Sequence, residues 1–127
     1  MRLISTRTHG ILDYLMGTLL ITAPVILDFA TGGPGQWMPT IIGTAMIGMA
    51  LMTDYESAVV RLIPMPAHLA HDFAAGALLA ASPWVSGFAD IVFWPHLILG
   101  VLGMGVSLTT ETHAPVSDAS SGAGDVG

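Results

Sequence analysis

Four long apolar segments, separated by short polar stretches, dominate the pattern of the chain. They cover approximately residues 10–29, 37–53, 67–86 and 91–109. About 20 apolar residues are needed to cross the hydrocarbon core of a bilayer, because a helix rises 1.5 Å per residue. A helix of a soluble protein normally has a charged or polar face in contact with water, and these segments have none. The pattern therefore predicts an all-α, integral membrane four-helix bundle, and a soluble helical bundle is the alternative.

The first and third segments carry the same special residues at the same spacing. His9, Asp13, Gly17 and Pro24 return 59 residues later as His68, Asp72, Gly76 and Pro83. The second and fourth segments match at a separation of 57 residues, with Trp37 and Gly43 answered by Trp94 and Gly100. Repeat one covers residues 9–56 and repeat two covers residues 68–113. Each repeat is expected to be a helical hairpin, so the bundle consists of two tandem hairpins in the same orientation, a parallel internal repeat.

The first apolar segment has a second interpretation. Arg2 and Arg7 precede it, and a basic stretch before an apolar run is typical of a signal peptide. Asp13 lies inside the run, however, and a closely similar segment recurs in the middle of the chain. We therefore interpret the first segment as a helix of the mature protein.

Composition supports lipid as the surrounding solvent. The chain has 127 residues, of which 53% are hydrophobic and 9% charged, whereas soluble proteins contain about 25% charged residues. A four-helix transmembrane domain is expected over residues 1–110. The Gly-rich, Ser-rich and acidic residues 111–127 are expected to form a disordered, acidic cytoplasmic tail.

The few basic residues predict the orientation in the membrane. Arg2, Arg7 and Arg61 fall on one side if all four segments cross, and basic residues favour the cytoplasmic side. This indicates a multi-pass protein of the cell membrane with both termini in the cytoplasm. Three basic residues are too few for a nucleic-acid partner. The absence of cysteine excludes disulfides, thiolate metal sites and cysteine nucleophiles.

Paired histidines and aspartates are the main candidate site. His9 and Asp13 are separated by four residues, as are His68 and Asp72, so each pair lies on one helix face, and His71 adds a neighbour to the second pair. If the repeats pack together, these groups converge at the cytoplasmic edge. Three interpretations stay open: a structural hydrogen-bond network, a metal or haem site, and a proton or ion path. The identity of any metal or cofactor is left open.

A short motif connects the chain to a known family. Ser82-Pro83-Trp84, near the end of the first helix of a two-helix unit, resembles the signature of the SPW-repeat family of small integral membrane proteins. The segment from Ser5 to Tyr14 is also similar to sequences of that family, whereas the first repeat retains the proline of the motif alone, as Pro24. The resemblance implies the fold and a membrane location, and it implies no particular activity.

The function that these patterns favour is a small non-enzymatic integral membrane protein. We expect it to act as a structural or accessory subunit in contact with the lipid bilayer, associating with itself as a homo-oligomer or with a larger membrane complex. The alternative is a metal-binding, haem-binding or proton- or ion-conducting bundle built on the His and Asp pairs. An enzyme is less favoured, because no nucleophile has a base at a recognisable spacing. His96 is expected to be a solvated residue at the outer interface.

Overall fold

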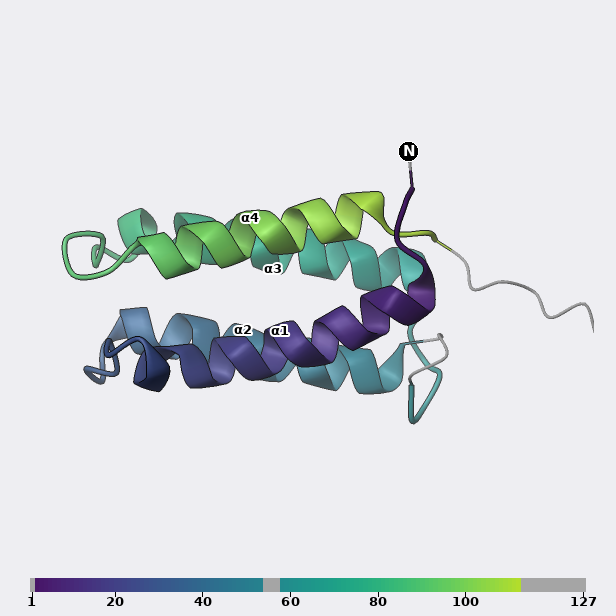
Figure 1. The fold of residues 1–127 in the computed structure, drawn as a ribbon, viewed down its shortest axis with the longest axis horizontal. Coiled ribbons are helices and arrows are strands. Elements are labelled where there is room, and N and C mark those ends of the chain that lie inside the picture. Colours follow the sequence, from purple (N-terminus) through teal and green to yellow (C-terminus); the bar gives the residue numbers. More distant parts are fainter. Residues whose placement is uncertain (1, 54–57, 113–127) are drawn as a thin grey trace, which may run out of the picture.

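A computed structural model describes residues 2–53 and 58–112 of the chain. It contains four helices, α1 (Thr6–Ile26), α2 (Pro34–Met52), α3 (Met65–Val85) and α4 (Trp94–Thr109). The predicted all-α fold of four helices in two hairpins is confirmed: α1 packs on α2, α3 packs on α4, and the hairpins meet along α2 and α3. Figure 1 shows that α1 and α3 begin at the same end and run in the same direction. We call this end the base of the bundle and the end with the two hairpin loops the tip.

Helices α1 and α3 end in the same way at the tip. Asp28 and Gly87 occupy equivalent positions after the helices and have φ angles of 58° and 71°. The amides of the following phenylalanines, Phe29 and Phe88, each donate a 2.8 Å hydrogen bond back to a proline carbonyl in the last helical turn. This pattern is a Schellman motif, in which a left-handed residue satisfies the last carbonyls of a helix.

The two prolines lie inside the helices, close to their ends. Pro24 and Pro83 are both buried, and each helix continues for two residues beyond its proline. Proline has no backbone N–H, so each proline removes one hydrogen bond of its helix. In the last turn this loss is small, and the helix ends two residues later.

Glycines allow the two helices of each hairpin to approach closely. A methyl group added to Gly43 would lie 2.6 Å from the carbonyl oxygen of Gly17, and one added to Gly100 would lie 2.5 Å from that of Gly76. These are the glycines that recur in the two repeats. Their recurrence therefore reflects the same backbone contact formed once in each hairpin.

The segments that flank the helices close the base of the bundle. The amide of Leu3 donates to the Thr109 carbonyl (2.7 Å), and the amide of Glu111 donates to the Ile4 carbonyl (2.9 Å). The loop before α3 bonds to the end of α2 in the equivalent way, with a bridge between Thr53 and Ile63. Glu111, the first residue of the expected tail, is held in place by its bond to Ile4. Residues 113–127, and the end of repeat one at 54–56, lie outside the described residues.

The interior is apolar between the hairpins, and much of the outer surface is apolar too. Leu20, Ile42, Met46 and Leu79 form the central core. Large apolar side chains more than half exposed occur on all four helices, including Ile11, Leu15, Ile41, Leu78 and Leu102. Of the helices described, α1 has both the length and the apolar character of a membrane span, whereas α4 is apolar but shorter. The predicted crossing by all four helices is thus supported for one of them by length and composition.

Candidate functional site

The two His/Asp pairs converge in the interior at the base of the bundle. His9 and Asp13 come from the first turns of α1, and His68 and Asp72 come from the first turns of α3. All four are buried, with exposed fractions of 1%, 3%, 0% and 5% in that order. The structure brings these four of the five candidate residues together, and we call them the His/Asp cluster.

Each histidine contacts the aspartate of its own helix and that of the other hairpin. His9 Nε2 lies 3.2 Å from Asp13 Oδ1 and 3.0 Å from Asp72 Oδ2. His68 Nε2 lies 2.9 Å from Asp13 Oδ2 and 2.9 Å from Asp72 Oδ2. The imidazole rings meet edge to face, with centroids 5.3 Å apart. The arrangement is a reciprocal connection between the two hairpins.

Two threonines orient the histidine rings. His9 Nδ1 lies 2.8 Å from the hydroxyl oxygen of Thr110, and His68 Nδ1 lies 2.6 Å from that of Thr53. Each threonine hydroxyl also donates a 2.6 Å hydrogen bond to the carbonyl of the residue four positions earlier in its helix. A hydroxyl has one hydrogen to donate. Each threonine must therefore accept from the histidine, so Nδ1 carries a proton in both rings.

These threonines were not among the predicted site residues. Thr53 and Thr110 align with each other in the two repeats, which was the signal that pointed to a shared role. A threonine in an apolar helix is ordinary, however, and their position beside the histidines depends on the backbone bridges at the base.

Because Nδ1 carries a proton in both rings, the cluster needs either additional protons or a bound cation. A neutral ring would then present the Nε2 lone pair to a carboxylate oxygen, and two acceptors would face each other at hydrogen-bond distance. One additional proton in each pair of histidine and aspartate resolves this conflict and leaves the cluster with no net charge. A divalent cation between the Nε2 and carboxylate atoms resolves it equally well.

The geometry of the cluster distinguishes between a haem site, a site for a single metal ion and an ion path. Asp72 Oδ2 contacts Nε2 of both His9 and His68 within 3.0 Å, so no porphyrin fits between these two rings. The four residues each offer one ligand atom within 4.8 Å of the others, which suits a single metal ion. Beyond the cluster, the core between the hairpins is apolar, as described above, and this gives little support to a continuous ion path.

The fifth predicted residue, His71, lies at the edge of the cluster. Its Nδ1 is 3.5 Å from Asp72 Oδ1, and its side chain is 36% exposed. His71 therefore touches the cluster from outside and does not join the atoms that converge within it.

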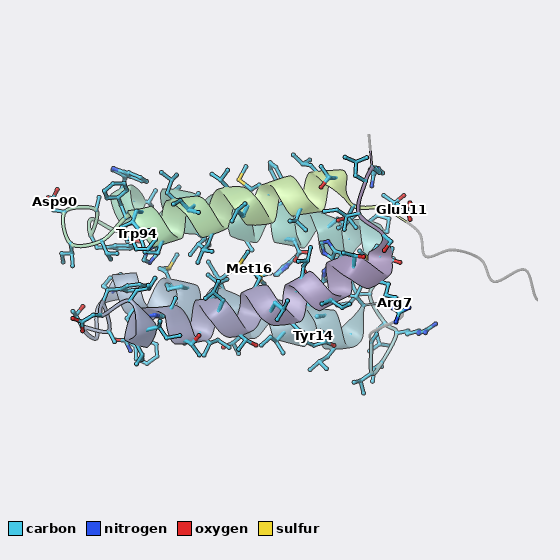
Figure 2. All side chains as sticks on the ribbon, in the orientation of Figure 1. Arg7, Tyr14, Met16, Asp90, Trp94 and Glu111 are labelled. Carbon is cyan, nitrogen blue, oxygen red and sulfur yellow. The ribbon has the colours of Figure 1, made fainter. Side chains whose placement is uncertain are left out.

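A cavity of about 180 Å³ adjoins one side of the cluster. His9, Asp13 and Asp72 form its polar end, and apolar side chains from all four helices form the rest of its wall. Met16, which lines this cavity, lies between the hairpins in Figure 2. Arg7 and Glu111 lie at the base in the same view, whereas Asp90 and Trp94 lie at the tip.

Comparison with known proteins identifies the family. The SPW repeat domain matches residues 7–110, which include both hairpins and the whole His/Asp cluster. The chain belongs to the SPW repeat family. No curated protein and no solved structure matches it.

The residues that name the SPW family lie at the tip, away from the cluster. Ser82 is buried and its hydroxyl donates to a carbonyl of its own helix (2.7 Å). Pro83 and its repeat partner Pro24 are buried in the last turns of α3 and α1. Trp84 is 55% exposed and lies beside Phe93, with ring centroids 5.9 Å apart. The motif therefore forms the end of a helix and contributes no group to the His/Asp cluster.

The prediction for His96 was wrong in this SPW repeat chain. His96 is 1% exposed, and its Nε2 donates a 2.7 Å hydrogen bond to the Gly35 carbonyl. Phe29 and Phe88 cover its ring, with centroid distances of 5.4 and 5.0 Å. Its Nδ1 is the buried side-chain atom without a hydrogen-bond partner among the residues described. The Schellman motifs that turn both phenylalanines inward could not be read from a Pro-His pair in the sequence.

Proposed function

We propose that this SPW repeat protein is a multi-pass integral membrane protein that acts as a structural or accessory subunit without enzymatic activity of its own. The observation that carries the proposal is the His/Asp cluster, because each of its histidines joins one hairpin to the other. The cluster makes a compact unit of two hairpins, and the apolar outer surface is left to contact lipid or a partner.

Helix dimensions and surface chemistry support the membrane location. At 1.5 Å per residue, α1 and α3 with 21 residues each span about 31 Å, α2 with 19 about 28 Å, and α4 with 16 about 24 Å. The hydrocarbon core is about 30 Å thick, and modest mismatch is tolerated. In water, the many exposed large apolar side chains would favour aggregation.

The two ends of the bundle differ in a way that supports an orientation. All three arginines lie at the base: Arg2 precedes α1, Arg7 is in its first turn, and Arg61 lies between α2 and α3. The three tryptophans lie near helix ends at the tip. Basic residues favour the cytoplasmic side, and tryptophan favours the membrane interface. The base, with the His/Asp cluster, then faces the cytoplasm.

The cost of burying aspartate supports a role for the cluster in fixing the fold. An aspartate at mid-bilayer costs about 2.5–3.5 kcal/mol on insertion scales. Pairing Asp13 and Asp72 with two histidines cancels the charge and satisfies the polar atoms, so the cost is offset when the hairpins are in register. Any other register loses the contacts between the hairpins and leaves each aspartate with the histidine of its own helix alone.

Single-cysteine labelling tests the proposal, because the natural chain contains no cysteine. Ala30→Cys and Ile91→Cys place a thiol at the tip, and Leu62→Cys places one at the base. All three positions are exposed. On intact cells, a membrane-impermeant maleimide is expected to react with the two tip cysteines, and with Leu62→Cys after permeabilisation only. Equal labelling of tip and base before permeabilisation, or release of the protein by alkaline carbonate, would refute a multi-pass topology.

The accessory role has its own test. Cross-linking in native membranes, followed by mass determination in detergent, is expected to show a discrete homo-oligomer or a complex with another membrane protein. A protein that stays monomeric and uncrosslinked at its natural abundance would contradict this role while leaving the topology result intact.

A further inference from the structure

We infer that the His/Asp cluster is a binding site for one divalent first-row transition-metal ion, coordinated by His9, Asp13, His68 and Asp72. The ion would connect the same two hairpins as the hydrogen bonds do, so the inference deepens the proposed function. It rests on the geometry of the cluster alone and does not require the chain to cross a membrane.

The donor set determines the class of metal. Two imidazole nitrogens and two carboxylate oxygens suit Zn²⁺, Fe²⁺, Co²⁺ or Mn²⁺. Mg²⁺ and Ca²⁺ prefer all-oxygen ligands. Copper(I) favours thiolate and thioether ligands, and the four groups that converge here offer neither.

The ligand atoms are already close to the spacing that a metal requires. In a tetrahedral zinc site with bonds of about 2.0–2.1 Å, neighbouring ligand atoms lie about 3.3 Å apart. The four contacts between Nε2 and carboxylate oxygens measure 2.9, 2.9, 3.0 and 3.2 Å. One ligand atom from each residue lies within 4.8 Å of the other three, so the most distant ligand atoms must approach each other by up to about 1.5 Å to form a tetrahedral site.

The threonines supply the outer support that metal-bound histidines normally have. A histidine that binds metal through Nε2 usually donates its Nδ1–H to an oxygen, which holds the ring and its tautomer. Thr110 and Thr53 do this for His9 and His68 at 2.8 and 2.6 Å. With Nδ1–H donated to a threonine in each ring, both Nε2 atoms are directed at one centre, where a metal ion would bind.

Charge balance also favours a divalent cation in the cluster. Two carboxylates and a divalent cation sum to zero when both imidazoles are neutral. Helices α2 and α4 add no charge beside the cluster: α2 contains no ionisable residue, and His96, the one in α4, lies at the other end. At the base, the Arg2 guanidinium donates a 2.7 Å hydrogen bond to the Thr110 carbonyl. An electrically neutral metal site is compatible with burial, whereas an isolated charge is not.

The test uses the full-length chain purified in detergent, stripped with a chelator and titrated with Co²⁺. We expect one Co²⁺ per chain, visible as intense ligand-field absorption of a tetrahedral site, with Kd of about 1 µM or tighter and displacement by Zn²⁺. His68→Gln is expected to abolish the absorption. His71→Gln is the matched control, since it removes a neighbouring histidine outside the cluster, and it should bind as the natural chain does.

A second pair of variants separates metal binding from a folding defect. Thr53→Val and Thr110→Val each remove one outer support, and each should weaken Co²⁺ binding by about 10–100-fold while helicity is retained. Thr53→Ser keeps the hydroxyl and should restore binding. These expectations concern affinity at constant fold, which a merely structural threonine would not change.

The outcomes are decisive for this inference and distinct from those of the labelling experiment. A natural chain that binds no more Co²⁺ than the double variant His9→Gln/His68→Gln overturns the metal site, even if the labelling confirms four crossings. Conversely, stoichiometric binding lost in His68→Gln supports the metal site even if the topology proves wrong.

Discussion

Replacing Gly100 by alanine should separate α3 from α4. The added methyl group would lie 2.5 Å from the Gly76 carbonyl oxygen and 2.6 Å from the Ala80 amide nitrogen. Both atoms belong to the backbone of α3, so they cannot rotate away, and the helices must move apart by about 1 Å to reach ordinary contact. Overpacking of this kind costs about 1–3 kcal/mol, and the higher helix propensity of alanine returns up to about 1 kcal/mol. We therefore expect the free energy of unfolding to fall by about 1–2 kcal/mol.

A second glycine of α4 provides the matched control. Gly105 has no atom within 4 Å of an added methyl group, so Gly105→Ala should leave the free energy of unfolding unchanged or raise it by up to about 1 kcal/mol. Both variants can be measured by titrating detergent-purified protein with a denaturing detergent and following helicity. If Gly100→Ala is as stable as Gly105→Ala, the close contact between α3 and α4 is not present as described.

Three further predictions follow from the same structure. Asp72→Asn removes a buried carboxylate that contacts Nε2 of both His9 and His68 and should lower the free energy of unfolding by about 3–5 kcal/mol. His71 is partly exposed, so His71→Gln should change this free energy by less than about 1 kcal/mol. Similar losses in the two variants would contradict the placement of Asp72 inside the cluster and His71 at its edge. Gly87→Ala should lower the free energy of unfolding by about 1 kcal/mol because the φ angle of Gly87 is 71°. Asp28→Gly, at the equivalent position after α1, should be neutral or stabilising. A Gly87→Ala variant that is more stable in thermal melts would be inconsistent with the Schellman motif. Finally, Zn²⁺ at 100 times its Kd should raise the free energy of unfolding by about 2.7 kcal/mol, and a chelator should reverse the increase. Thermal melts that do not change with Zn²⁺ would contradict the metal site.

Much of the fold was predictable because the chain contains two copies of one pattern. Long apolar runs required helices, and the recurrence of His9 and Asp13 as His68 and Asp72 required that the two hairpins be alike. Chemistry at helical spacing also singled out five candidate residues, of which the structure brings four together. These features are local, since the spacing of residues along a helix places them on a common face whatever the helix packs against.

The tertiary structure decided which groups those residues meet. The contacts from His9 to Asp72 and from His68 to Asp13 join residues far apart in sequence, and no spacing rule chooses them over contacts within each pair. The role of Thr53 and Thr110 likewise depends on the bridges that close the base of the bundle. Burial of His96 follows from two phenylalanines that the helix ends turn inward.

The sequence by itself thus determined four helices, their pairing into two equivalent hairpins and a set of five candidate residues for the site. The tertiary structure alone decided that both histidines donate Nδ1–H to a threonine hydroxyl, so that two Nε2 atoms and two carboxylates face one centre. The physical reason is that periodicity specifies the direction of a side chain relative to its own helix. The partner of that side chain depends on how separate helices pack, and here glycine contacts and backbone bridges set that packing.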